Sequence, residues 1–538
     1  MHGGFIHLLE VLLLLTGGLF AFSLYCRNWI LGKIQKITSD FSAYLSEQFR
    51  GFCFFLSNEA IFHKTTLFLI ITSGVLIRLY FLIYQPIYHD EAKTVFSFAS
   101  VSIFETISNY YVPNNHIFHS LLVKIFIIFF GNHPWSIRMP VFIAGILTLL
   151  MCYAVCRRFF DKQTALIATA LCAGNYPLIQ YSSNARGYML VTFFFLAMLY
   201  FAMEIRKTRR KTPFVLFVFL GAFGMWTIPT MVYPIAISLF SLFFLNISLR
   251  KILSAAVLIL ILTALLYTPA LIRSGLSSIV ANQYVRTENF KNLIIHAGIS
   301  LRETHAWFHY MEPYILNFTL TALFIFALLA GFNHRKISMR FFLMVILPCL
   351  SLILIKKSIG PIRIWLFLLP PYFFITANGL TLILNPLKKN VFVYPFSALF
   401  LLIFLLPETI HGISNPFEMG DSCVAAKEIV DFLTPSLTDN TVLESETPCT
   451  GPIRYYLISK GISLEHFLWF DPKKSNPATS NNISTVYLVT KRPENELALY
   501  GYSKKNSGFS QALLSKTFGD MNIYHIDKIR KGVESVSR

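Results

Sequence analysis

The chain has 538 residues, of which 55% are hydrophobic and only 14% are charged, and its mean hydropathy is +0.58. A soluble domain cannot bury that much apolar surface, so the composition excludes an ordinary soluble protein. The net charge is +19, but the Lys and Arg residues cluster between apolar runs. We therefore interpret them as charges that orient a membrane protein and not as a nucleic-acid-binding surface.

Apolar runs near the length that a helix needs to cross a hydrocarbon core of about 30 Å recur along the whole chain. Because a closed barrel gives only weak alternating segments, the sequence predicts a polytopic α-helical membrane protein. The first run lacks a basic leader and a small-residue cleavage site, so we interpret it as a retained membrane segment. The runs cover residues 5–25, 65–84, 117–130, 138–156, 163–180, 188–205, 213–229, 232–249, 252–272, 313–333, 341–355, 363–384 and 391–407.

The run 117–130 is short and carries Lys124, and the distribution of charge decides how it is placed. If 65–84 leads outward and 117–130 does not cross, all the basic clusters fall inside, as the positive-inside rule requires. We therefore expect 117–130 to be an amphipathic or re-entrant helix at the outer interface, about twelve spans, and Asp90 outside. The clusters are 157–158, 206–211, 250–251, 334–336 and 388–389.

The tail has a lower apolar fraction and an alternation of helix and strand patterns, which predicts a small extracytoplasmic α/β domain. Cys423 and Cys449 lie in this tail, and whether they pair stays open because spacing alone shows no geometry. Helices are expected at 425–433, 453–460 and 512–518, and strands at 441–443 and 485–490. The expected parts are an N-terminal membrane segment and linker at 1–64, a transmembrane catalytic module at 65–407 with its outer loop at 85–137, and the tail domain at 408–538.

Asp90 and Glu91 follow directly on the run 65–84, where a helix leaves the bilayer. Adjacent carboxylates at such a place suit a general base and a partner that orients it or binds a metal. A solvated polar loop explains the same residues, and the pair by itself does not decide between the two interpretations.

Amide, imidazole and cationic side chains flank several other runs on the same expected face. Taken singly, each fits a helix cap, an interfacial anchor or an exception to the charge rule. Their convergence on one face indicates a pocket for a lipid-linked anionic substrate, because guanidinium groups bind phosphate through paired hydrogen bonds. These candidate residues are Asn115, His116, Arg138, Tyr181, Arg186, Arg302, His305, Lys357 and Arg363.

The order of these motifs resembles the GT-C membrane glycosyltransferases, the superfamily of protein O-mannosyltransferases and lipid A aminoarabinose transferases, and most of all its bacterial lipopolysaccharide-type branch. The likeness covers residues 65–538. One departure is Ser183-Asn184, where relatives often carry Gln-Glu, so that a second acid would have to come from Glu91 or Glu303. The matching motifs are Asp-Glu-Ala at 90–92, Asn-Asn-His at 114–116, Arg-x-Pro at 138–140, Tyr-Ser-x-x-Ala-Arg-Gly-Tyr at 181–188, and Arg363 before a Leu-Pro-Pro segment.

The resemblance implies a GT-C-like fold and transfer of a hexosyl or pentosyl group from a polyprenyl-phosphate donor, usually with inversion. Asp90 matches the proposed general base. Arg186, Arg363 and Lys357 would neutralise the lipid phosphate, while His116 and Arg138 would position substrate. The acceptor implied is a glycolipid, glycan or protein of the cell envelope, at the outer face of the plasma (inner) membrane, with the tail domain on the periplasmic side.

Two other functions remain as hypotheses at this point. A transporter or flippase of lipid-linked sugars would carry charges buried mid-span and paired halves with broken helices, and the sequence shows no clear sign of either. A polymerase or ligase of lipid-linked glycans would use a similar outer pocket, for which the loop 273–312 is a candidate. No metal-ligand spacing occurs, and a requirement for a divalent cation stays open.

Overall fold

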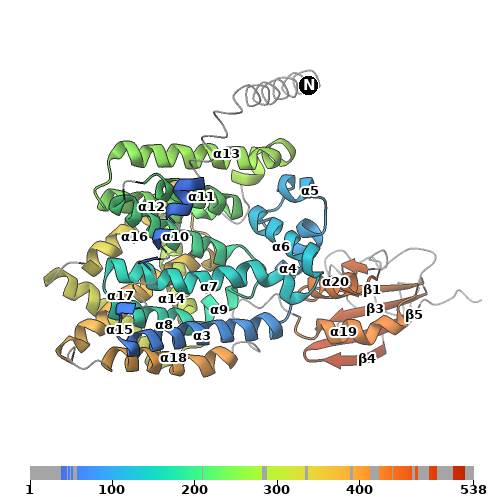
Figure 1. Cartoon of the computed structure of the whole chain (residues 1–538). Coiled ribbons are helices and arrows are strands. Elements are labelled where there is room, and N and C mark those ends of the chain that lie inside the picture. The colour runs from blue at the N-terminus through green and yellow to red at the C-terminus, as the bar shows by residue number, and fades with distance from the viewer. Residues whose placement is uncertain are drawn as a thin grey trace, which may run out of the picture.

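The computed structural model describes residues 38–44, 46–48, 50–51, 57–208, 210–280, 287–333, 337–387, 392–411, 423–438, 440–462, 467–469, 484–493 and 513–527. The expected run 5–25 and the clusters 334–336 and 388–389 lie outside these residues. Figure 1 shows a large bundle of helices with a smaller domain of strands and helices at one end.

In the described part, the helices of the bundle that are long and apolar enough to cross a membrane are α3, α7, α10, α13, α16 and the segment around α17. Shorter apolar helices correspond to most of the remaining expected runs. The prediction of a polytopic α-helical membrane protein is therefore confirmed. The bundle contains α3 (Ile61–Tyr84), α4 (His89–Thr94), η1 (Val95–Ala99), α5 (Ile103–Ser108), α6 (Ile117–Phe130), α7 (Pro134–Phe159), α8 (Lys162–Gly174), α9 (Tyr176–Tyr181), α10 (Tyr188–Lys207), α11 (Thr212–Thr227), η2 (Pro229–Met231), α12 (Val232–Phe244), α13 (Leu249–Val280), α14 (Phe290–Phe308), α15 (Tyr314–Asn333), α16 (Ile337–Lys356), η3 (Ile362–Leu368), α17 (Leu369–Leu384), η4 (Asn385–Leu387) and α18 (Val393–His411).

Helix α8 lies in the core of the bundle, where every residue from Thr164 to Gly174 is buried. Its alanines let neighbouring helices approach closely, as small residues do in membrane interiors. Helix α13 is at the other extreme, since Leu260, Leu265 and Leu276 are each more than 60% exposed. Such a leucine-covered surface suits contact with lipid tails.

Helix α6 has the bounds that the sequence predicts and packs on α7. Its Lys124 is satisfied locally, because the ammonium group donates to the carbonyls of Ala99 and Val101. Ile128 and Phe129, in the last turn, are 67% and 75% exposed. This apolar surface is consistent with an interfacial position of α6, which stays a prediction.

The C-terminal domain is an α/β unit, as predicted, with a mixed sheet in the strand order β2-β1-β3-β5-β4. Strand β1 is parallel to β2 and β3, whereas β5 is antiparallel to β3 and β4. Cys423 and Cys449 form a disulfide, which answers a question that the sequence left open. The elements are α19 (Ala426–Leu433), η6 (Thr434–Ser436), β1 (Thr441–Ser445), α20 (Thr450–Ser459), β2 (Phe467–Trp469), β3 (Thr485–Thr490), β4 (Leu513–Phe518) and β5 (Met521–Asp527).

The expected helix at 512–518 is wrong, because Leu513–Phe518 is strand β4. It forms a hairpin with β5 through a turn in which Gly519 has a φ of +60°, a conformation that glycine adopts without strain. Strand β4 is at the edge of the sheet and its side chains are mostly exposed. Without a buried face, no alternation of apolar and polar residues marks it as a strand.

Helix α20 joins the C-terminal domain to one end of the bundle, beside α4 (Figure 1). Tyr455 is 1% exposed and belongs to a buried apolar cluster that also contains Ala92 and Val95. The guanidinium of Arg454 lies 4.4 Å from the ring centre of Phe96. Gly451 abuts α4 so closely that a Cβ there would lie 2.8 Å from His89 Nδ1. The domain thus contacts the very segment that carries Asp90 and Glu91.

The ends of the bundle can be distinguished by single cysteines introduced by Ser459→Cys in α20 and Ser248→Cys between α12 and α13. Both serines are exposed. We expect a membrane-impermeant maleimide to label S459C in intact cells and S248C only after permeabilisation, each compared with the parent chain. Labelling of S248C in intact cells would contradict the orientation derived from the basic clusters.

Candidate functional site

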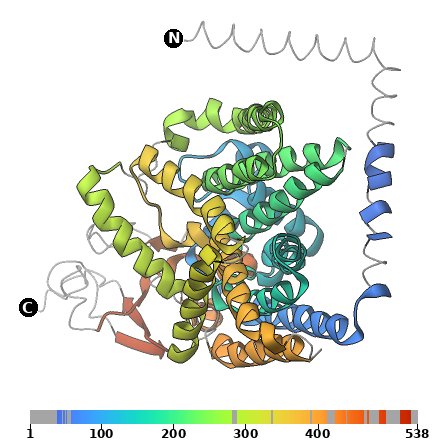
Figure 2. The same cartoon turned by 90° about the vertical axis from the view of Figure 1, so that its left-hand side faces the viewer.

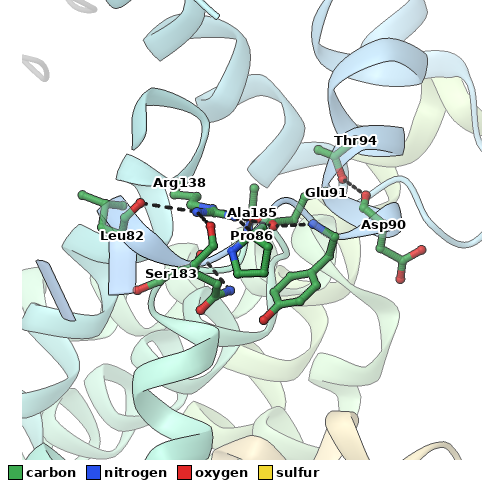
Figure 3. Close-up of polar contacts among 10 residues, drawn as sticks. Leu82, Pro86, Asp90, Glu91, Thr94, Arg138, Ser183 and Ala185 are labelled. Carbon is green, nitrogen blue, oxygen red and sulfur yellow. Dashed lines mark hydrogen bonds and ion pairs between the residues drawn. The ribbon is translucent and has the colours of Figure 1, made fainter. Parts of the chain in front are cut away.

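A buried ion pair between Arg138 and Glu91 lies at the end of the bundle that carries the C-terminal domain, and neither side chain is exposed to solvent. Arg138 Nε donates to Glu91 Oε1 and Nη2 donates to Oε2, both at 2.8 Å. The same guanidinium donates to the carbonyls of Gln85 at 2.7 Å and Pro86 at 2.8 Å, and to that of Leu82 at 3.3 Å (Figure 3). Arg138 therefore caps the C-terminal end of α3 as well as binding Glu91.

Glu91 uses its remaining acceptor capacity on the backbone. Its Oε2 accepts from Tyr88 N at 3.0 Å, which caps the start of α4, and its Oε1 accepts from Ala185 N at 2.7 Å. The carboxylate thus connects α4, α7 and the 182–187 loop. Both oxygens are engaged, so this geometry suits Glu91 as a positioning residue beside the reacting groups.

Asp90 faces the other way, and its carboxylate points away from the Arg138 cluster in Figure 3. Its side chain is 36% exposed, and Oδ2 lies 3.4 Å from Arg186 Nη2. Partial burial favours the neutral acid, but the charges of Arg186 and Arg363 outweigh it and hold the pKa of Asp90 below its usual value. Asp90 is therefore an ionised, accessible carboxylate at neutral pH.

Arg186 is 4% exposed, and hydrogen bonds to the loop that precedes α6 hold its side chain in place. Its Nη1 donates to the Asn114 side-chain oxygen, and to the Asn114 carbonyl at 3.3 Å. Its Nε is buried and has no hydrogen-bond partner in the described part of the chain. Because an unsatisfied charged donor is costly, this N–H is suited to an acceptor oxygen supplied by a bound ligand.

His116 supports the same loop through its ring. Its Nδ1 accepts from Gly187 N at 2.8 Å, so in the neutral imidazole the proton sits on Nε2. Burial and the nearby Arg186 charge lower the pKa of His116 well below its ordinary value. Gly187 must be glycine here, because a Cβ would lie 2.5 Å from a methyl group of Thr227.

Tyr188 joins Arg363 to this group, because Arg363 Nε donates to Tyr188 Oη at 3.1 Å, and the Tyr188 ring stacks edge-on with His116. Arg363 also lines a pocket of about 330 Å3 whose other wall is α14. Glu303 and the hydrogen-bonded side chains of Glu288 and His296 line that pocket. Glu303, the alternative second acid, therefore borders the arginine side of the site.

The structure brings together Asp90, Arg186, His116 and Arg363, but it gives other candidates structural contacts. Asn115 donates to the carbonyls of Thr106 and Asn109 and accepts from Ser120, so its amide is fully engaged. Tyr181 is 2% exposed and packs edge-on against Trp307.

The candidates on the later loops lie apart from this group. His305 bonds Thr321 at 2.9 Å, and Arg302 is exposed on α14. The side chain of Lys357 is exposed, and its carbonyl accepts from Glu288 N at 2.8 Å. None of the hydrogen bonds or ion pairs observed between described residues links Arg302 or Lys357 to Asp90.

Sequence reasoning missed two residues that build the site. Asn114, which accepts a hydrogen bond from Arg186, lies in the Asn-Asn-His motif at 114–116, but only Asn115 and His116 of that motif were candidates. Arg78 is buried within α3 and donates to the carbonyls of Cys172 and Ala173 and to Ser182 Oγ. It thereby ties the C-terminal end of α8 to the 182–187 loop. An arginine inside an otherwise apolar run is itself the signal, since such charges are rarely tolerated without a role. Contrary to the expectation from the sequence, the run 65–84 therefore carries a buried charge, and structural hydrogen bonds satisfy it.

The described residues contain no group of three or more His, Cys, Asp or Glu side chains placed to hold a metal ion. At Asp90 the neighbouring carboxylate is already bound to Arg138. A divalent cation at Asp90 would thus need ligands from a substrate or solvent.

The sequence profile of a family described as Dolichyl-phosphate-mannose-protein mannosyltransferase matches residues 113–272, which include His116, Arg138 and Arg186. No curated protein sequence matches the chain. The structure is similar to that of ArnT from Cupriavidus metallidurans in the apo state, with a TM-score of 0.55 at 10% identity, covering 85% of this chain and 97% of the other. ArnT bound to undecaprenyl phosphate gives a TM-score of 0.50 at 12% identity, with the same coverage. The GT-C fold expected from the resemblance is therefore confirmed.

The two adjacent carboxylates should differ in their effect on stability. Glu91→Gln leaves the buried Arg138 charge uncompensated, and we expect a loss of about 3–5 kcal/mol in the free energy of unfolding. Asp90→Asn removes a partly exposed charge and should have a much smaller effect. Thermal unfolding of both variants in one detergent provides the test, and equal melting temperatures would contradict the structural role of Glu91.

Proposed function

We propose that this chain, which has the GT-C fold, is a membrane glycosyltransferase that moves a sugar from a polyprenyl-phosphate donor to an acceptor hydroxyl. The observation that supports this most strongly is the ionised, accessible carboxylate of Asp90 beside Arg186 and within the field of Arg363. The carboxylate is suited to take the proton that the acceptor hydroxyl must lose. The two guanidinium groups are suited to bind the lipid phosphate as it leaves.

Asp90 is the proposed general base. As the acceptor oxygen bonds to the anomeric carbon, its proton passes to Asp90, and the bond from that carbon to the phosphate oxygen breaks. Attack from the face opposite the phosphate inverts the configuration. Phosphate leaves readily, so the reaction does not depend on a strong acid from the protein.

Arg186 and Arg363 are the proposed phosphate ligands. The unpartnered Nε of Arg186 supplies a donor, and the charge that grows on the leaving phosphate is stabilised by both guanidinium groups. An anionic donor would also compensate part of the positive field that lowers the pKa of Asp90. Binding of the donor would therefore make Asp90 a stronger base at the moment it is needed.

The other members of the site act on these three residues. Glu91 and Arg138 orient the start of α4, and His116 holds the 182–187 loop through Gly187. Lys357, on the exposed loop before Arg363, provides further positive charge for an approaching lipid phosphate. The proposed acceptor is a glycolipid, glycan or protein of the cell envelope. The disulfide supports an oxidising, periplasmic location for the C-terminal domain.

Asp90→Asn should abolish transfer, because general-base catalysis contributes a factor of roughly 100 or more. Mass spectrometry of envelope glycans from cells lacking the protein identifies the missing sugar, and complementation with wild type or D90N then reports activity. The matched control is Glu105→Gln on α5, a similarly exposed acid paired with Arg273. Full restoration of the sugar by D90N would exclude Asp90 as the base.

The pH dependence of transfer tests the contact between Arg186 and Asp90. Arg186→Gln removes a positive charge that lowers the pKa of Asp90, so this pKa rises and more of the carboxylate is protonated at low pH. The acid limb of the kcat/KM profile should therefore move to higher pH in R186Q, while Arg186→Lys should leave it nearer the wild-type position. If the acid limb of R186Q stays at the wild-type pH, Arg186 does not lower the pKa of Asp90.

A further inference from the structure

A basic pocket of about 610 Å3 lies at the end of the bundle opposite Asp90. Helices α7 and α10 begin beside the site, near Arg138 and Tyr188, and their last turns line this pocket together with the start of α16. Figure 2, in which the left-hand side of Figure 1 faces the viewer, shows the bundle from this end. Because both helices are long and apolar enough to cross a membrane, the pocket lies at the opposite end of these spans from the site.

Four cationic side chains and no acidic side chain line the pocket: Arg158, Arg206, Lys207 and Arg340. Arg158 is compensated, because it lies 2.7 Å from the buried carboxylate of Glu204 and its guanidinium stacks 3.9 Å from the Tyr200 ring centre. The other three are exposed. Within the part of the chain that the structure describes, no carboxylate forms an ion pair with them, so the pocket keeps an excess of positive charge.

The remaining wall is apolar and comes mainly from α12 and α16, where Phe244 and Met344 line it. Phe244 is 38% exposed and its neighbour Phe243 is 64% exposed, so the apolar wall continues onto the outer surface of the bundle. A pocket with cations at the membrane boundary and an apolar wall matches the two parts of a phospholipid, its phosphate and its acyl chains.

Orientation by the positive-inside rule explains why Lys and Arg lie at this face, but it does not require them to converge on one cavity from separate helices. We propose that this pocket binds an anionic phospholipid of the leaflet opposite the proposed active site. The lipid phosphate lies against Arg206, Lys207 and Arg340, and its acyl chains follow the apolar wall past Phe244. This inference is independent of the proposed transfer reaction.

The test uses the full chain in nanodiscs of mixed phosphatidylglycerol and phosphatidylcholine, followed by transfer to detergent and native mass spectrometry of retained lipid. Wild type should retain phosphatidylglycerol in preference to phosphatidylcholine. The double variant Arg206→Gln with Arg340→Gln should lose that retention. The matched control is Arg250→Gln with Lys251→Gln, which removes the same charge from exposed residues of the same helix-end face outside the pocket, and it should retain the lipid.

Several results would overturn the proposal. One is equal retention of the two lipids by wild type, and another is retention of phosphatidylglycerol by R206Q/R340Q. A third is an equal loss of phosphatidylglycerol in R250Q/K251Q, because this loss would mean that general surface charge and not the pocket retains the lipid. A separate arm adds soluble glycerol phosphate at millimolar concentration. Displacement of the lipid by this compound would indicate a site for a soluble phosphate, whereas retention supports the membrane lipid. Circular dichroism of every variant shows whether it is folded as the wild type.

Discussion

The buried ion pair of Arg138 and Glu91 holds together the end of the bundle beside the C-terminal domain. Two charges removed from water are costly, and the cost is offset here because the hydrogen-bonding groups are nearly all used. The pair also fixes local geometry, because removal of either partner would leave the other as an uncompensated buried charge. It defines where α3 ends, where α4 begins and where Ala185 lies.

This constraint separates the roles of two neighbouring carboxylates. Consecutive residues of a helix point about 100° apart, so fixing Glu91 toward Arg138 turns Asp90 away, toward Arg186. One acid is buried, compensated and rigid, and the other is accessible and ionised. The C-terminal domain reinforces the same segment, since Tyr455 packs into the apolar cluster beneath α4. A soluble-looking tail is thereby part of the support of a membrane-boundary site.

Charge is arranged differently at the two ends of the bundle. At the end beside the C-terminal domain, the charges of Arg186 and Arg363 lower the pKa of Asp90, and we propose that both bind a leaving phosphate. At the opposite end, Arg206 and Arg340 border an apolar wall and have no acid among the lining residues. The proposals for the two ends differ accordingly: arginines beside a carboxylate are proposed to stabilise a leaving phosphate, and arginines beside apolar surface are proposed to bind a membrane lipid.

The membrane class, most helix positions and the α/β nature of the tail could be predicted from the sequence, because apolar periodicity and run length are local properties. The distribution of basic clusters also predicted that Asp90, Arg186 and Arg363 lie on one face of the membrane. Which of these residues contact one another is visible only in the three-dimensional structure. It assigned Glu91 and Asn115 to structural contacts and brought in Arg78, since hydrogen-bond partners distant along the chain leave no periodic signal. It likewise made 513–518 an edge strand, because pairing with β5 outweighs local spacing.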